Sequence, residues 1–444
     1  MASSNANTST PQHSSTIAVR DDPMAETVIE RYLNTVGKVE GISLIYNNMT
    51  GIGMIQTSSV FQQSGWLPVT VFFLLFMIIS SLCALFVVEA MQAIPGNRYF
   101  QGNVEFGTLI NFYFGSTAHI LGQFGLYGAL EIMAMGSIIQ SSQTMDNLFI
   151  DLFGRTCGVS LGITNNTSSA IGWYCVTDHG TGISPFGNQY MLFTGGLLAA
   201  SLVIVPQCIF PLADVLWVQV VTFLLTLAVF GEWIVSSIKE GLHADYVPLA
   251  GNTSGYAGLV GTVMLNYAFT QTIPAWVNVR RPDVSIQESI WVSSSAGFIS
   301  YMLTGLLPAL AYVIPDGSNL IAVMTTQGGI ISKVFGYIFS LLALMMSVPV
   351  LLIVAKLNLD QNFQLPRGVS SVMALVVPWI LSIPFLTGSY LTSLTTWGSL
   401  IFVSVANFVV PLIIFLKATE FRKSYNEHRR TYLLSLKYDI KCTI

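Results

Sequence analysis

The feature that most constrains this chain is an apolar stretch, residues 42–66, that polar residues and glycines interrupt in its middle. The interruption consists of Asn47, Asn48, Thr50, Gly51 and Gly53. Each glycine costs a helix about 1 kcal/mol relative to alanine. Inside a bilayer, a helix break is tolerated only where the backbone lines a polar cavity or is buried in protein. The stretch therefore predicts a membrane helix that is broken at mid-depth.

A second apolar stretch, residues 261–278, has the same character and reads GTVMLNYAFTQTIPAWVN. Its polar interruption consists of Asn266, Thr270, Gln271 and Thr272, which precede Pro274. The proline alone could mark a simple kink. Two interrupted spans at corresponding places in two halves of a membrane chain indicate the substrate site of a secondary transporter.

The composition supports a membrane protein and disfavours other classes. Charged residues are 9% of the chain, against about 25% in a typical soluble protein, and 52% of the residues are hydrophobic. The chain has no basic stripe of the kind that would indicate a nucleic-acid partner. We find no HExxH motif, nucleophile elbow or paired intramembrane aspartates, so we expect neither an enzyme nor a metal or organic cofactor. The expected partners are the transported substrate and membrane lipid, without an obligate protein partner.

The hydrophobic pattern predicts an all-α membrane protein with about ten spans, five in each half. Residues 1–38 read as a disordered cytosolic tail, residues 39–418 as the transmembrane domain, and residues 419–444 as a cytosolic tail. The expected spans are 42–66 (broken), 67–94, 112–140, 190–210, 215–238, 258–278 (broken), 290–314, 330–356, 369–386 and 396–416. We find no residue-level repeat, which is common in transporters built from structural repeats.

The positive-inside rule sets the expected orientation. With the N-terminus in the cytosol, only Arg155, Lys239 and Lys333 of the 18 basic residues face outward. The glycosylation sequons at Asn165, Asn166 and Asn252 then also lie outside. The outer loop, from about residue 141 to 188, contains Cys157 and Cys175, the two cysteines that share one polar loop, and we predict a disulfide between them.

Several segments resemble the amino acid/auxin permease family, and the resemblance covers nearly everything from Ser43 to Lys417. These segments are NNMTGIGMIQTSSVFQQSGW, VEAMQAIPGN, SSQTMDNLF, NYAFTQTIPAWVN, SVPVLLIVAKLNL, VPWILSIPF and WGSLIFVSVANFVVPLII. The resemblance implies a five-plus-five inverted-repeat fold with broken helices 1 and 6. It also implies amino acid transport coupled to H⁺ or, in some branches, to Na⁺. Members usually have an eleventh span, whereas this chain ends in a charged tail.

The interrupted stretches suggest how an amino acid is held. A helix that restarts at mid-membrane offers free N–H groups to a carboxylate, and Gly51 and Gly53 let the backbone approach without a Cβ clash. Close packing of helices by small residues is the alternative. Carbonyls freed between Tyr267 and Gln271 can accept from the ammonium, and Phe269 is placed either to cover the site or simply to pack. Neither interruption contains a charged side chain, so we expect neutral substrates, with Met49 and Tyr127 near the substrate side chain.

Polar residues recur every four positions in the third span, at His119, Gln123, Tyr127 and Glu131. Such a stripe faces either a water-filled path or a hydrogen-bonded helix seam. Glu131 is our candidate proton site, and we favour H⁺ as the coupling ion. In the Na⁺-dependent branch of the family, an Asn and a hydroxyl at the positions of Asn47 and Ser347 coordinate the ion, so Na⁺ coupling stays open.

Other readings remain. An amino acid sensor of the same fold is the main alternative to a transporter, although residues 1–38 carry no recognisable docking motif. A channel is disfavoured because no repeated filter sequence is present. The expected location is the plasma membrane or the vacuolar or lysosomal membrane, with both termini in the cytosol.

Overall fold

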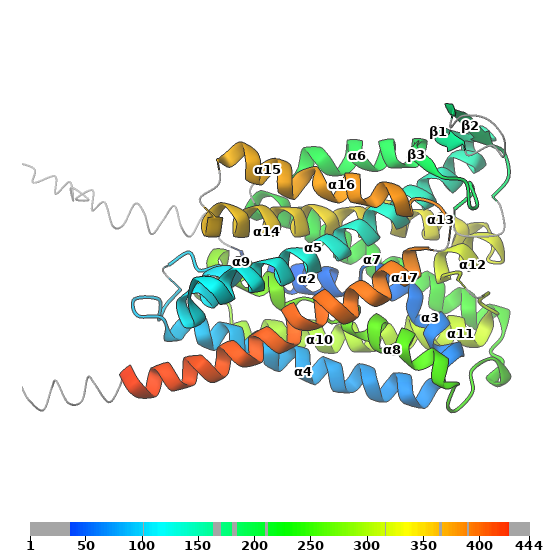
Figure 1. Cartoon of the computed structure of the whole chain (residues 1–444). Helices are drawn as coiled ribbons and strands as arrows, with labels where there is room; N and C mark the ends of the chain where they lie inside the picture. The colour runs from blue at the N-terminus through cyan, green and yellow to red at the C-terminus, as the bar shows by residue number, and fades with distance from the viewer. Residues whose placement is uncertain are drawn as a thin grey trace, which may run out of the picture. The chain divides into compact units, whose positions relative to one another are not determined.

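The computed structural model describes residues 36–100, 102–162, 170–179, 184–208, 212–315, 317–363, 366–388 and 390–425. These residues are mostly helical, and a small sheet is inserted between two of the helices. Figure 1 shows long helices running side by side along one direction. The expected tails lie largely outside the described residues, although the last helix continues to Tyr425.

Both predicted helix breaks are confirmed. The first interrupted stretch forms α2 (Lys38–Met49) and α3 (Ile52–Ser64), with the break at Thr50 and Gly51. The second forms α8 (Thr253–Asn266), a 3-10 turn η2 (Thr270–Thr272) and α9 (Ile273–Val279). Pro274 lies in the first turn of α9, where its missing N–H removes no helical hydrogen bond.

Hydrogen bonds pair the half-helices across the two breaks. The backbone N–H of Val36 donates to the carbonyl of Val279 at 2.8 Å, which joins the start of α2 to the end of α9. Asn266 of α8 donates to the carbonyl of Gly53 in α3 at 3.3 Å. In Figure 1, α2 and α9 accordingly lie toward the left end, and α3 and α8 toward the right.

Five of the described helices are long and apolar enough to cross a membrane: Trp66–Ala93, Trp217–Glu240, Ile286–Ala311, Gly368–Phe385 and Tyr390–Tyr425. The first two correspond to α4 (Trp66–Ala93) and α7 (Leu212–Glu240). The third consists of α10 (Ile286–Tyr301), which continues through a π-helical turn η3 (Met302–Leu306) into α11 (Leu307–Ala311). The last two are α15 (Arg367–Leu375) with α16 (Val377–Ser382), and α17 (Tyr390–Gly398) with its continuation. These helices are compatible with a membrane-embedded protein.

The eighth and tenth expected spans, 330–356 and 396–416, are also helical, with irregular turns. One comprises α13 (Ile330–Ile338), a π-helical turn η4 (Phe339–Leu344) and α14 (Met345–Phe363). The other contains the π-helical turns η6 (Ser399–Val403) and η7 (Val405–Val409) beyond α17. The structure adds a short helix that the hydrophobic pattern does not predict, α12 (Leu320–Thr326).

The third expected span is longer than predicted. Residues 112–140 belong to α5 (Phe106–Phe153), a 48-residue helix with one kink at Gly115, where φ is +79°. Glycine adopts this left-handed conformation without the steric penalty of a Cβ. The prediction that an outer loop begins near residue 141 is therefore wrong, because polar residues continue the helix by facing protein rather than solvent.

A three-stranded antiparallel sheet follows α5, with strand order β2-β1-β3. It consists of β1 (Thr156–Gly162), β2 (Ala170–Val176) and β3 (Met191–Thr194). The sheet departs from an all-helical prediction, and β3 occupies the expected start of the fourth span, whose helix α6 is only Gly195–Gln207. Cys157 pairs with Cys175 in the register of β1 and β2, and the predicted disulfide between them is confirmed.

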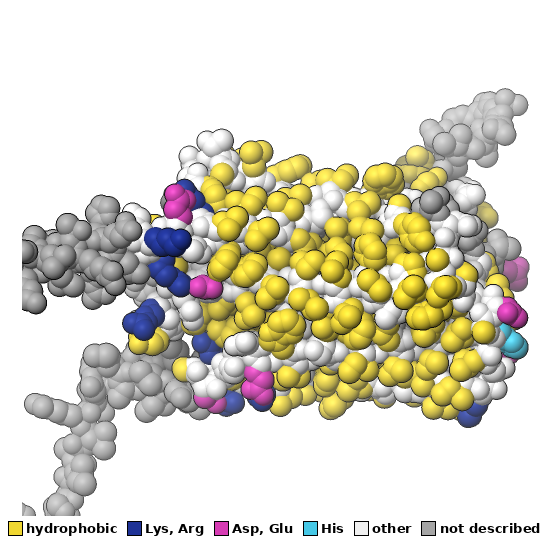
Figure 2. All heavy atoms as spheres, turned by 90° about the horizontal axis from the view of Figure 1, so that it is seen from below, with side chains coloured by type: hydrophobic (Ala, Val, Ile, Leu, Met, Phe, Trp, Pro, Cys, Tyr) yellow, Lys and Arg dark blue, Asp and Glu magenta, His cyan; other side chains and the backbone are white. Residues whose placement is uncertain are grey.

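The surface in Figure 2 has a broad apolar band, while dark blue Lys and Arg side chains gather mainly at its left end. Exposed leucines, isoleucines and valines on α4 and α7 supply such side chains, together with Tyr390 and Trp397 of α17. Because lipid tails are themselves apolar, this distribution is what a bilayer-embedded surface requires.

The sheet generates the first testable prediction. The sequons at Asn165 and Asn166 lie outside the described residues, between β1 and β2, while Asn252 is exposed at the start of α8. We expect non-reducing thiol labelling to leave Cys157 and Cys175 unmodified, with Cys83 and Cys208 as free but buried controls that react after denaturation. Enzymatic deglycosylation should shift the wild type more than an Asn165/Asn166 double variant. Labelling of Cys157 or Cys175 in the native, unreduced protein would contradict the bond.

Candidate functional site

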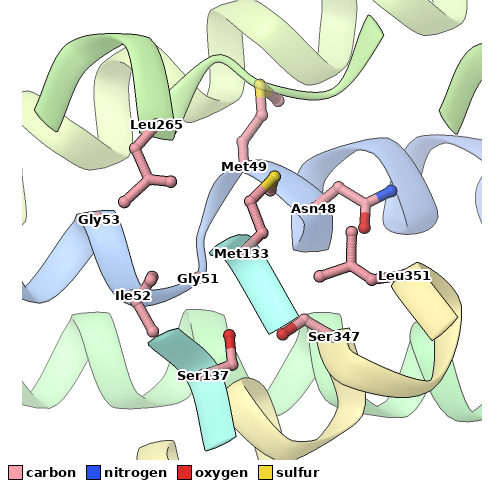
Figure 3. A pocket seen from close by; sticks show the side chains of 10 residues that line it. All are labelled: Asn48, Met49, Gly51, Ile52, Gly53, Met133, Ser137, Leu265, Ser347 and Leu351. Carbon is pink, nitrogen blue, oxygen red and sulfur yellow. The ribbon is translucent and has the colours of Figure 1, made fainter. Parts of the chain in front are cut away.

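A small cavity lies at the first helix break (Figure 3). In Figure 3, the non-helical backbone at Gly51 runs along it, between the two halves of the broken helix. The break, α5, the end of α8 and α14 supply its walls. The lining residues are Asn48, Met49, Gly51, Ile52, Gly53, Met133, Ser137, Leu265, Ser347 and Leu351.

The first turn of α3 has no capping side chain. A helix start carries unsatisfied N–H groups and the positive end of the helix dipole, both of which favour an anion. None of the residues that line the cavity has a charged side chain. The site can therefore offer main-chain donors to a carboxylate, together with neutral surroundings for the rest of a ligand.

The two glycines at the break differ in what surrounds them. A Cβ on Gly51 would meet no heavy atom within 4 Å, so this position is open. A Cβ on Gly53 would lie 2.0 Å from Oδ1 of Asn266. Gly53 is therefore needed for close contact between α3 and α8, which is the packing alternative, whereas Gly51 fits the expectation of free backbone approach.

Four carbonyls at the breaks accept hydrogen bonds from protein side chains. Ser80 of α4 donates to the carbonyl of Tyr267 at 2.7 Å. The Thr272 hydroxyl donates to the carbonyl of Phe269 at 2.8 Å. Tyr301 of α10 contacts the carbonyls at the ends of α2 and α8. In this conformation, two of the carbonyls expected to receive an ammonium, those of Tyr267 and Phe269, thus already accept from side chains.

Several residues expected at the substrate do not line the cavity. Phe269 and Tyr267 are fully buried, and the ring of Tyr267 packs against Phe73 and Tyr301. Gln271 instead bonds to Asn407 and Met133, as described below. Tyr127 donates to the carbonyl of Met373. Thr50 turns back to its own helix, where its hydroxyl donates to the carbonyl of Tyr46 at 3.1 Å.

Gln271 connects three elements through its backbone and its side chain. Its backbone N–H donates to Oδ1 of Asn407 at 3.1 Å, and Nδ2 of Asn407 donates to Oε1 of Gln271 at 3.3 Å. Nε2 of Gln271 reaches the sulfur of Met133 at 3.0 Å. These hydrogen bonds link the second break to η7 and to α5. They also give the cavity-lining residue Met133 a polar contact through its sulfur.

The two residues proposed to coordinate Na⁺ make contacts in different places. Ser347 lines the cavity near Asn48. The Asn47 amide donates instead to Gln219 of α7, at 2.8 Å to its carbonyl and 2.9 Å to Oε1. Oδ1 of Asn47 is buried without a hydrogen-bonding partner among the described residues. An oxygen suited to a hard cation is therefore present near the break.

Glu131 is buried in α5, at 5% exposure. Neither of its carboxyl oxygens makes a hydrogen bond of good geometry to a described residue, although the hydroxyl of Tyr127 lies close enough to interact with the carboxyl. Burying an unpaired ionised carboxylate is very unfavourable, so this environment suits the neutral form. Tyr127, one turn earlier, lies beside it. The other members of the stripe form a polar seam, because Nε2 of His119 lies 3.1 Å from Oδ1 of Asn362 in α14 and 3.3 Å from Nε2 of Gln123.

A second buried carboxyl lies at the end of the bundle where α2 begins. Glu105 precedes α5, and its Oε1 accepts from Asn278 at 3.0 Å, at the end of α9. Burial raises the pKa of Glu105 to about 7, although the hydrogen bond from Asn278 acts in the opposite direction. The same amide group also bonds to the backbone of Val104. These contacts hold the last turn of α9 against the start of α5.

Comparisons of the sequence with protein-family models and with curated proteins find no match. Across the described ranges, no group of three or more His, Cys, Asp or Glu side chains is arranged to hold a metal ion.

Five lining residues are not among the predicted site residues: Ile52, Met133, Ser137, Leu265 and Leu351. Leu265 directly precedes the polar interruption of its span, and Ile52 stands between the two glycines. Their neighbourhood in the sequence could have indicated them. Nothing in the local pattern of α5 or α14 distinguishes Met133, Ser137 or Leu351 from core residues.

The contrast between the two glycines generates the second prediction. We expect Gly53→Ala to destabilise the purified protein by about 1–3 kcal/mol, because its Cβ overpacks the contact with Asn266. Gly51→Ala should change stability far less, since its Cβ enters open space. Thermal unfolding in detergent measures both variants side by side. Equal destabilisation of the two variants would contradict the assignment of Gly51 to the cavity wall.

Proposed function

We propose that this chain is an ion-coupled secondary transporter that moves neutral amino acids across a membrane. The proposed fold is the five-plus-five inverted repeat with ten spans that the resemblance to the amino acid/auxin permease family implies. The observation that carries the proposal is the pair of broken helices whose halves contact each other across the bundle, with a cavity at the first break. Breaks of this kind place binding groups at mid-membrane.

The chemistry of the cavity favours a zwitterion with an uncharged side chain. The uncapped start of α3 suits the carboxylate. The side chains of Met49, Met133, Leu265 and Leu351 offer an apolar wall, and Ser137 and Ser347 add hydroxyls. A lysine or glutamate substrate would lack a countercharge here, which is costly at this depth. The free space is small in this conformation, so binding requires the half-helices to separate.

The distribution of charge favours cytosolic termini. Helix α2 begins, and the C-terminal helix stops, at the same side of the bundle. Basic side chains gather on this side in Figure 2. Under the positive-inside rule this end faces the cytosol, and the disulfide-linked sheet faces the opposite side, where oxidation is permitted.

For coupling, we favour H⁺ through Glu131. A buried carboxyl can take up and release a proton as its surroundings change between conformations. Na⁺ coupling is the second candidate, because Oδ1 of Asn47 is buried and unpartnered within the described residues and Ser347 lines the cavity.

The substrate class is tested with purified protein in proteoliposomes. We expect alanine, glutamine and leucine to be taken up, and arginine and glutamate to compete at least tenfold less well. Burying an unpaired charge costs more than about 1.4 kcal/mol, the free energy that corresponds to a tenfold loss of affinity. Gly51→Ala should lower this uptake with little change in thermal stability, since its Cβ projects into open space at the cavity wall. Stronger competition by arginine or glutamate would overturn the neutral-substrate proposal, and absence of any amino acid flux with retained binding would favour a sensor.

The coupling ion is tested by separate pH and Na⁺ gradients. Glu131→Gln should flatten the pH dependence of uptake, because the amide keeps the shape of the carboxyl but cannot exchange a proton. Glu89→Gln is the matched control, since Glu89 is a partly exposed carboxylate that pairs with Arg422. If replacing Na⁺ by choline abolishes uptake at constant pH, and Glu131→Gln leaves the pH profile unchanged, sodium coupling through Asn47 and Ser347 replaces the proton proposal.

A further inference from the structure

The hydroxyl of Tyr301 lies between the ends of the two broken helices. It is 2.7 Å from the carbonyl oxygen of Met49, the last residue of α2, and 3.0 Å from that of Asn266, the last residue of α8. Tyr301 is fully buried, and its ring packs against Phe73 at 5.0 Å between centroids. One side chain of α10 therefore serves both breaks.

A tyrosine hydroxyl has a single proton, so it can donate fully to only one of two carbonyls at a time. The two carbonyl oxygens carry like partial charges, and the shared hydroxyl lies between them. Without it, each buried carbonyl would lose the hydrogen bond that Tyr301 provides, which is unfavourable. The hydroxyl thus sets the separation between the end of α2 and the end of α8.

The position of Tyr301 is also the boundary between the two pairs of half-helices. Two other α10 side chains hold α2, since Ser293 donates to the carbonyl of Ile42 at 3.1 Å and Tyr46 bonds to Ser300 at 2.6 Å. The end of α8 is held on its other side by α3 through Asn266. Tyr301 links the α2–α10 group to the α3–α8 group at the point where both helices stop.

This link bears directly on the cavity, because the residues beside the two carbonyls line it. Met49 is one wall residue, and Leu265, next to Asn266, is another. The side chain of Met49 also packs on α10, where a Cβ on Gly297 would lie 3.2 Å from its terminal methyl carbon. Helix α10 therefore contacts both the backbone and the side chain of Met49.

We propose that Tyr301 is a positioning residue that determines which sizes of substrate side chain the site accepts. Its hydroxyl holds the Met49 wall and the Leu265 wall at a fixed spacing without touching the substrate. The inference rests on the proposed transport of neutral amino acids and adds the residue that sets their size range.

The test compares alanine with leucine in proteoliposome uptake, expressed as the ratio of their kcat/KM values. Tyr301→Phe keeps the ring but removes the shared proton, so the two carbonyls repel and the walls separate. We expect the ratio of alanine to leucine to fall by roughly five- to tenfold, mostly through a higher KM for alanine, in line with the loss of uniform binding.

Two further variants separate positioning from general stability. Tyr46→Phe is the matched control, because it removes another α2–α10 hydrogen bond without touching the carbonyls at the breaks, and it should leave the ratio unchanged. Gly297→Ala pushes on Met49 from behind and narrows the cavity, so it should move the ratio in the opposite direction, in favour of alanine. This variant also tests the inference should Tyr301→Phe fail to fold.

The outcomes are distinct. Opposite shifts in Tyr301→Phe and Gly297→Ala, with Tyr46→Phe unchanged, support the inference. If the wild type transports neutral amino acids but the ratio is the same in all three variants, or Tyr46→Phe shifts it as much as Tyr301→Phe, the inference is overturned and the proposed function stands. If the wild type neither binds nor transports neutral amino acids, the proposed function fails and the inference fails with it.

Discussion

The structure depends on how backbone groups are satisfied where two helices stop inside an apolar bundle. An unpaired carbonyl or N–H in such surroundings costs several kcal/mol, so each break needs donors and acceptors from elsewhere. Three neighbouring helices supply them, through Ser80 of α4, Tyr301 of α10 and Asn407 of η7. The helices around the breaks are therefore fixed in register by hydrogen bonds as well as by packing.

At the start of α3, no side chain caps the helix, and the cavity lies there. The first turn of α3 lacks a capping side chain, and Gly51 leaves its backbone accessible from the cavity. At the second break, by contrast, side chains occupy the carbonyls of Asn266, Tyr267 and Phe269. A ligand that presents an anionic group to α3 meets preformed donors, whereas a cationic group must displace or share protein donors at the second break.

The sequence predicts the breaks and the disulfide well, because their causes are local. Gly51 and Gly53 beside two amides weaken a helix wherever it lies, and two cysteines in one polar loop have few other partners. The sheet and the length of α5 were not predicted, since buried polar residues after Gln140 look like loop residues until their partners are known. The role of Gly53 depends on Asn266, and that of Met49 on Tyr301, 252 positions later. Periodicity gives the face on which a residue lies but not the residue that it meets.

The geometry of α5 also limits how a coupling site could act on the cavity. Glu131 precedes Met133 by two positions, about 200° around the helix, so the carboxyl faces away from the cavity that Met133 lines. On that part of α5, Gly128 packs against Phe402 and Ile132 against Gly398, both in the last described span. Asn407 of the same span bonds to Gln271, and Gln271 reaches Met133. If Glu131 carries the coupling proton, its charge state acts on the packing of α5 against this span. Gln271 is then the connection through which that packing reaches the second break and the cavity wall.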